Sequence, residues 1–241
     1  MTPSTIVAMG GGGFSMEPEN LALDQFVLSC ASQENPRVVF LPTASGDAEG
    51  YIEHFYWAFE SLPCRPSHLS LQRREMSDLR SFLLGQEIIY VGGGNSFNML
   101  TLWRAHGVDK ILKEAWEKGI VLCGLSAGSV CWFESCLTDS FGPELQAMND
   151  CLGFLKGSHC PHFDSEERRR PTYTRMVQEG KLPPGIAADD GVGLVFHGTD
   201  LVETVSSRST AKAWKVDPSG TATAIDPRLL DPVPRVLPGG A

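Results

Sequence analysis

A serine flanked by small residues is the strongest chemical signal in the chain. The segment 124–128, Gly-Leu-Ser-Ala-Gly, fits the GxSxG pattern of a nucleophile elbow, in which a serine occupies a sharp turn between a strand and a helix. The small neighbours of Ser126 leave room for its hydroxyl to stand clear. A helix expected over 127–133 would direct its positive end at Ser126 and at an oxyanion formed there. The alternative is a tight turn that serves only helix packing.

Two glycine runs follow apolar segments that are typical of strands. Gly92-Gly93-Gly94-Asn95 comes directly after the run 88–91. Ligands of open parallel sheets bind beyond the carboxyl ends of the strands, so the amides of this turn could face the same reaction centre as Ser126. The alternative is a turn that only connects a strand to a helix. The run 10–13 fails the GxGxxG pattern of dinucleotide-binding proteins, because Ser15 stands three positions after Gly12, and we interpret it as a structural turn.

The chain offers several general bases and acids. His159 and His162 have the HxxH spacing of some zinc sites, but no further ligands cluster nearby and Pro161 disfavours one continuous helix, so no metal is predicted. A base and its nucleophile need to be neighbours only in space, so chain position does not select among the six histidines. They are His54, His68, His106, His159, His162 and His197, and the candidate acids are Asp139, Asp164, Asp189 and Asp190.

The elements that must position these residues alternate along the chain. Strand-like apolar runs occupy 5–9, 38–41, 88–91 and 120–123, and helical spacing occupies 21–30, 52–62 and 97–116. Strands that are apolar on both faces and alternate with helices predict an α/β fold with a mostly parallel sheet and helices on both faces. A weaker strand is expected near 69–71. Beyond Asp139 we expect loops, with short strands at 192–196 and 210–216.

Length and composition favour one folded domain over 1–241. The chain has 42% hydrophobic residues and a net charge of −9, and it has no internal repeat and no dividing linker. Its last residues, 227–241, are rich in proline and glycine, and we expect a poorly ordered or surface-draped tail.

Charge, hydropathy and cysteine content restrict the partners and the compartment. An acidic chain without a basic run is a poor candidate for binding nucleic acid or an anionic membrane. No apolar stretch is long enough to span a bilayer, and the amino terminus lacks the features of a signal peptide. Seven cysteines without a CxxC pair favour reduced thiols. The sequence therefore predicts a soluble, cytoplasmic protein.

Taken together, strand-GGGN, strand-GxSAG and the Pro-His-Phe of 161–163 resemble the peptidase E family of serine peptidases, family S51, which are aspartyl dipeptidases. The resemblance covers roughly residues 6–216. It implies a class I glutamine amidotransferase-like fold, a flavodoxin-like three-layer arrangement, with serine in place of cysteine and no cofactor. It also implies that Ser126 is the nucleophile and His162 the general base. Asp190 falls at the third triad position, and the amides of Gly94 and Ala127 form the oxyanion hole.

Three features depart from the family pattern. The third triad position holds aspartate where the family has glutamate, one methylene longer, so Asp189 is an alternative to Asp190. The segment after Pro-His-Phe is short and passes directly into 164–170, where Arg168 matches the arginine that reads an acidic substrate side chain. Arg169 and Arg170 are its alternatives. The residues 129–133 after the elbow indicate a separate branch, whose substrates can differ.

The resemblance implies hydrolysis of short peptides, dipeptides with an N-terminal aspartate first, by a monomer or homodimer. Cleavage of aspartyl-arginine linkages, as by cyanophycinases, is a narrower variant. An esterase of the α/β-hydrolase type is one alternative, and its chain order would require Ser126, Asp164 and His197. The other alternative is a non-catalytic binding protein that keeps the amidotransferase-like shape.

Overall fold

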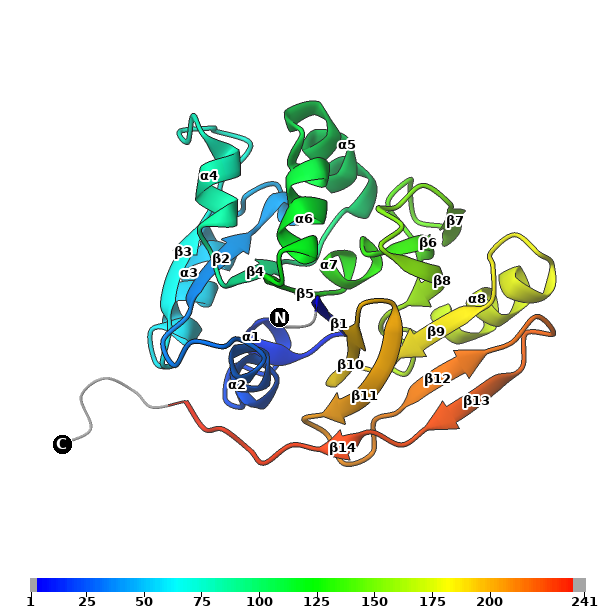
Figure 1. Cartoon of the computed structure of the whole chain (residues 1–241). Helices are drawn as coiled ribbons and strands as arrows, with labels where there is room; N and C mark the ends of the chain where they lie inside the picture. The colour runs from blue at the N-terminus through cyan, green and yellow to red at the C-terminus, as the bar shows by residue number, and fades with distance from the viewer. Residues whose placement is uncertain (1–3, 236–241) are drawn as a thin grey trace.

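The computed structural model describes residues 4–235, which form two β-sheets surrounded by helices (Figure 1). The larger sheet has the strand order β14-β11-β10-β1-β5-β4-β2-β3. Its strands are β1 (Thr5–Met9), β2 (Arg37–Leu41), β3 (Arg65–His68), β4 (Ile88–Val91), β5 (Val121–Leu125), β10 (Val192–His197), β11 (Asp200–Ser206) and β14 (Arg228–Leu229). The five strands β1 to β5 are parallel to one another, and β10 joins β1 in antiparallel register.

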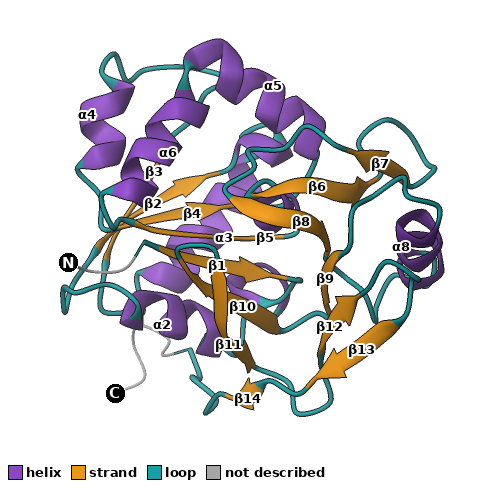
Figure 2. Cartoon of the chain, turned by 45° about the vertical axis from the view of Figure 1, so that its right-hand side comes forward, coloured by secondary structure: helices purple, strands orange, loops and turns teal. Residues whose placement is uncertain are grey.

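Helices cover both faces of this sheet (Figure 2). One apolar cluster joins one face to α4 (Leu79–Leu84), α5 (Ser96–His106) and α6 (Val108–Glu117). The opposite face packs on α1 (Gly13–Met16), α2 (Ala22–Ser29) and α3 (Glu49–Phe59). Every residue of β1, β4 and β5 is buried, as expected for strands covered on both faces. The predicted three-layer α/β architecture is therefore confirmed.

A second sheet occupies the part of the chain where loops were expected. Its order is β13-β12-β9-β8-β6-β7, and the expectation of a mainly irregular region after Asp139 is wrong. Three of its strands are parallel neighbours, β6 (Phe133–Thr138), β8 (Leu155–Cys160) and β9 (Gly185–Ala188). The others are β7 (Gln146–Met148), β12 (Ala213–Val216) and β13 (Ala222–Ile225), and α8 (Arg169–Gln178) connects β8 to β9. Several of these strands are short and polar, which hid their periodicity.

Two helices differ from their predicted bounds. The run 97–116 forms two helices because Gly107, with φ of 71°, ends α5 in the left-handed conformation. The helix after the elbow, α7 (Ala127–Val130), stops before Phe133, where β6 enters the second sheet.

The remaining expectations concern one strand and the tail. The weak strand near 69–71 lies instead at β3, and the 3₁₀ turn η1 (Thr43–Ser45) follows β2. Within the predicted tail, β14 pairs with β11, and residues 236–241 lie outside the described residues.

The two sheets share one apolar core. The cluster that contains Leu122 of β5 also contains Leu155 of β8. This shared core supports our proposal that the chain forms a single domain. Within residues 4–235, no helix is long and apolar enough to cross a lipid bilayer.

Candidate active site

Ser126 lies at the carboxyl end of β5, in a strained turn that leads into α7. Its backbone has φ of 54° and ψ of −116°, a conformation that non-glycine residues rarely adopt. The flanking glycines make this turn possible. A Cβ on Gly124 would collide with the Gly128 carbonyl, and one on Gly128 would collide with the Val91 carbonyl. The glycines of the GxSxG motif are therefore required for the tight turn at Ser126, as the sequence predicted.

Two backbone amides near Ser126 are free to bind an anion. Gly94, after β4, has φ of 133°, and a Cβ there would collide with the Ala44 carbonyl. Among the described residues, no hydrogen-bond acceptor contacts the N–H of Gly94 or of Ala127. The preceding amide, Gly93 N–H, donates to the Tyr51 hydroxyl at 3.2 Å, which holds the glycine turn in place. The lack of an internal acceptor is one requirement of the predicted oxyanion hole, whereas neither Gly94 nor Ala127 is among the residues that line the pocket with Ser126.

The second sheet supplies the histidine and the acid. His162 follows β8 by two residues, Asp190 follows β9 by two residues, and these strands are parallel neighbours. The side chains of His162 and Asp190 are therefore in contact, and His162 Nδ1 lies 2.6 Å from Asp190 Oδ1. His162 also has a positive φ of 54°, and its N–H donates to the Gly10 carbonyl after β1 at 3.2 Å. The carboxyl ends of the two sheets therefore converge on one site.

The environment of Asp190 favours its ionised form. Burial works to raise the pKa of this carboxyl, but hydrogen bonds with His162 and Ser165 outweigh it, and the pKa lies below its usual value. Asp164 Oδ1 accepts from the Asp190 N–H at 2.9 Å, and Arg208 donates to the Asp190 carbonyl at 3.0 Å. Asp164, Ser165 and Arg208 therefore fix the loop that carries the acid. Neither Asp164 nor Arg208 could be assigned this role from the sequence.

Asp189, the alternative acid, is used elsewhere. Its Oδ1 accepts from Trp214 Nε1 and its Oδ2 from the Lys212 N–H, both at 2.9 Å. Burial raises the pKa of this carboxyl. Asp189 thus ties the site loop to β12, whereas Asp190 faces His162.

The glycine run 10–13 also belongs to the site. The Gly11 backbone passes so close to the triad that a Cβ would lie 2.9 Å from His162 Nδ1 and would overlap Asp190 Oδ1. Only glycine fits at this position without displacing the pair. The run is the structural turn that the sequence predicted, but its contact with the histidine was missed. The run 10–13 follows a strand, as the run 92–94 does, and this position was the sequence signal that could have placed it at the site.

Ser126 and His162 line one pocket of about 420 Å³. No hydrogen bond joins their side chains in this structure, and such bonds commonly tighten only when substrate binds. The other lining residues include Ser15, Met16, Tyr51 and Leu125, and none of the residues that line this pocket is Asp, Glu, Lys or Arg. The pocket lining therefore offers no carboxylate, ammonium or guanidinium group to a ligand.

The three candidate arginines lie outside this pocket. Arg168 is exposed and donates to the Pro143 carbonyl at 3.1 Å, with Glu144 at 3.9 Å. Arg169 is buried and paired with Glu166. The guanidinium of Arg170 stacks on Trp214, 4.1 Å from the ring centroid. Each arginine has a structural contact, and none lines the Ser126 pocket.

His197, His159 and Asp139 do not line the Ser126 pocket. β10 runs antiparallel to β1 and pairs His197 with Thr5, so His197 lies at the opposite end of the sheet. His159 is fully buried, with Nδ1 2.8 Å from the Ile186 carbonyl, and burial lowers its pKa to about 4. Asp139 lines a separate pocket. Among residues 4–235, no three potential ligands cluster in a way that could hold a metal ion.

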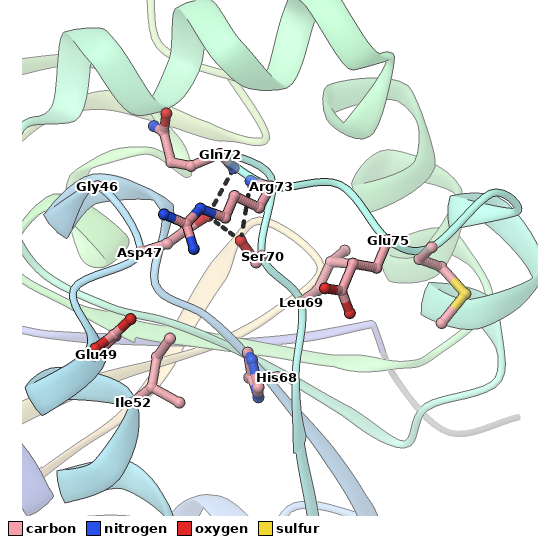
Figure 3. A pocket seen from close by; sticks show the side chains of 11 residues that line it. Gly46, Asp47, Glu49, Ile52, His68, Leu69, Ser70, Gln72, Arg73 and Glu75 are labelled. Carbon is pink, nitrogen blue, oxygen red and sulfur yellow. Dashed lines mark hydrogen bonds between the residues drawn. The ribbon is translucent and has the colours of Figure 1, made fainter.

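A larger cavity of about 520 Å³ lies beyond the loop that follows β2 (Figure 3). Asp47, with φ of 57°, closes one side by accepting hydrogen bonds from Ser70, Leu71 and Gln72. None of Ser126, His162 and Asp190 lines this cavity. Although it is larger than the Ser126 pocket, it is therefore not the candidate active site.

Comparison with known proteins agrees with this geometry. The model of peptidase family S51 matches residues 6–204. An uncharacterized peptidase of Bacillus subtilis, YgaJ, is 56% identical over 88% of this chain and 91% of its own length.

Two crystal structures share the fold at low identity. One is a peptidase from an acI-B1 Actinobacterium, with a TM-score of 0.63, 18% identity and coverage of 96% of this chain and 97% of the other. The other is a candidate peptidase E protein from Listeria monocytogenes, with a TM-score of 0.60, 20% identity and coverage of 83% and 96%. The resemblance inferred from the sequence is confirmed.

Proposed function

This chain belongs to peptidase family S51, and we propose that it is a serine peptidase that hydrolyses short peptides with Ser126, His162 and Asp190. The observation that carries the proposal is that His162, whose Nδ1 lies 2.6 Å from Asp190 Oδ1, lines the same pocket as Ser126. A histidine that is oriented by a carboxylate and shares a pocket with a strained serine is the arrangement of a nucleophilic hydrolase.

The proposed reaction proceeds through an acyl-enzyme. Ser126 Oγ attacks the peptide carbonyl while His162 Nε2 accepts the hydroxyl proton, and Asp190 holds Nδ1–H. The amides of Gly94 and Ala127 stabilise the tetrahedral oxyanion, and one such donor contributes about 3 to 4 kcal/mol. His162 then donates its proton to the leaving amine, and the C–N bond breaks. Water, deprotonated by His162, hydrolyses the ester and restores Ser126. No cofactor takes part in this scheme.

Dipeptides with an N-terminal aspartate are the substrates we propose first, and the support for them is the family resemblance. The pocket itself supplies no arginine or lysine. Recognition of an aspartyl side chain therefore requires a cation from outside it, and Arg168 is the residue we assign. Arg168 would have to leave the Pro143 carbonyl to reach the substrate. Hydrolysis of aspartyl dipeptides should therefore be compared with hydrolysis of dipeptides that have a neutral first residue.

We also propose that the enzyme is cytoplasmic, and the support for this is the sequence, whose seven cysteines without a CxxC pair favour reduced thiols.

The test is a comparison of substrates with the Ser126→Ala protein as blank. Aspartyl-leucine, leucyl-leucine, glutamyl-leucine and a p-nitrophenyl ester are assayed in parallel. Hydrolysis of aspartyl-leucine alone, lost in the variant, is the expected result. Ester turnover without peptide cleavage would favour the esterase, and no turnover together with an unreactive Ser126 would favour a binding protein.

A further inference from the structure

A second pocket, of about 440 Å³, opens beside the Ser126 pocket between α1 and α3. We call it the α1–α3 pocket, and its lining residues are Phe14, Ser15, Pro18, Glu53, His54 and Trp57. We propose that it binds a large aromatic or apolar side chain on the residue that follows the scissile bond. The inference rests on the proposed function and adds to it the class of leaving group that the enzyme prefers.

The two pockets are neighbours. Ser15 lines both of them. Tyr51 of the Ser126 pocket stacks on Phe14 of the α1–α3 pocket, with ring centroids 5.5 Å apart and an interplanar angle of 26°. The α1–α3 pocket is therefore next to the place where a substrate would be held at Ser126.

The position of the α1–α3 pocket indicates the leaving-group side. Gly11 lies against His162, and only Gly12 separates it from α1, which carries Phe14 and Ser15. The general base of a serine hydrolase gives its proton to the leaving amine. The residue after the scissile bond thus departs on the His162 side, where α1 begins.

The walls favour an aromatic or apolar occupant. Phe14 is 2% exposed and is fixed by edge-on contacts with Phe40 and Phe55, so it forms a rigid floor. Trp57 is 43% exposed and offers a large apolar surface at the opening. Its orientation is set by Arg235, whose guanidinium lies over the indole and whose Nε donates to the Trp57 carbonyl at 3.1 Å. Rigid aromatic walls bind apolar side chains with little loss of conformational freedom.

The kinetic test compares leaving residues on a common first residue. Aspartyl-phenylalanine should have a kcat/KM about tenfold or more above that of aspartyl-glycine in the unmodified protein, since each methylene in an apolar pocket contributes about that much discrimination or more. Trp57→Ala should remove most of this preference and leave aspartyl-glycine within about twofold. Trp57→Phe should retain it. Phe141→Ala is the matched control, because Phe141 is 45% exposed and lies in the chain segment before β7.

A binding measurement separates this inference from the proposed function. Phenylalaninamide, which mimics the leaving amine, is titrated by NMR into the unmodified protein and the Trp57→Ala variant. Binding that Trp57→Ala weakens, with no binding of glycinamide, is the expected result. Absence of phenylalaninamide binding, or equal binding by both proteins, would overturn the pocket. Binding without hydrolysis of any peptide would overturn the peptidase proposal and leave the aromatic pocket supported.

Discussion

Asp189 and Asp190 are neighbours in the chain, yet their carboxylates serve different parts of the molecule. Asp190 Oδ1 lies 2.6 Å from His162 Nδ1, while Asp189 binds Trp214 and the Lys212 amide. Because successive residues after β9 point in different directions, Asp190 contacts His162 and Asp189 ties the loop to β12. The acidic pair therefore performs two separable tasks.

Substitution of each aspartate tests this division. Asp190→Asn should lower kcat roughly 10⁴-fold, because the amide no longer selects the productive tautomer of His162. Asp189→Asn should keep kcat within about tenfold and cost about 1 kcal/mol of unfolding free energy through a weakened hydrogen bond. Kinetics and urea unfolding of both variants provide the check. Equal losses of kcat would contradict the assignment.

Replacement of His162 or His197 by alanine distinguishes the proposed triad from the esterase alternative. His162→Ala should reduce kcat about 10⁴-fold or more, because the nucleophile loses its base. His197→Ala should leave kcat within about twofold, since His197 lies at the far end of β10. Steady-state rates on the best peptide and on a p-nitrophenyl ester measure both effects. A larger loss with His197→Ala would support the esterase arrangement.

Gly11 should be intolerant of any side chain. In Gly11→Ala the added methyl must displace Asp190 or His162, and kcat/KM should fall about 100-fold. Gly50→Ala is the control, because a Cβ there meets nothing within 4 Å and Gly50 lies in α3. It should leave kcat unchanged and raise the unfolding free energy by about 0.5 to 1 kcal/mol. Similar kinetics for the two variants would show that Gly11 has no contact with the triad.

Buried Asp24 should make stability depend on pH. It is fully buried in the first turn of α2, where Tyr90 donates to its Oδ1 at 3.1 Å. Its Oδ2 has no hydrogen-bond partner among the described residues. Burial raises the pKa of this carboxyl to about 7.

The raised pKa of Asp24 sets the direction in which stability changes with pH. The contribution of Asp24 is fully present below about pH 4 and is lost as the pH rises to 7, because only the unfolded chain ionises in that window. Asp24→Asn cannot ionise, so between pH 5 and pH 8 it should gain about 3 kcal/mol relative to the unmodified protein. Urea unfolding at several pH values measures the difference. Parallel stability profiles would exclude Asp24 as the titrating group.

The main sheet and the tight turn at Ser126 could be predicted because their signals are local. The apolar runs at 88–91 and 120–123 are buried on both faces, and the small residues around Ser126 are required by the turn itself. The second sheet could not be predicted in this way, because its strands alternate little and pair across long sequence separations. β8, for example, reads Leu-Lys-Gly-Ser-His-Cys.

The candidate site shows the same contrast. Asp190 could be separated from Asp189 only by the direction of each side chain after β9, a property of the fold. Likewise, the contact of Gly11 with His162 and the support of Asp190 by Arg208 depend on segments that are distant in sequence. The resemblance to a known family was needed to choose His162 among six histidines.

We propose that His162 activates Ser126 as a nucleophile, and covalent labelling of Ser126 is the measurement that tests this proposal. The protein is incubated with a fluorophosphonate, and the modified residue is identified by mass spectrometry of its peptides. We predict one label per chain on Ser126, formed slowly or not at all in His162→Ala and at the normal rate in His197→Ala. An unlabelled Ser126 in the folded protein, or labelling that is unaffected by His162→Ala, would show that His162 does not activate Ser126.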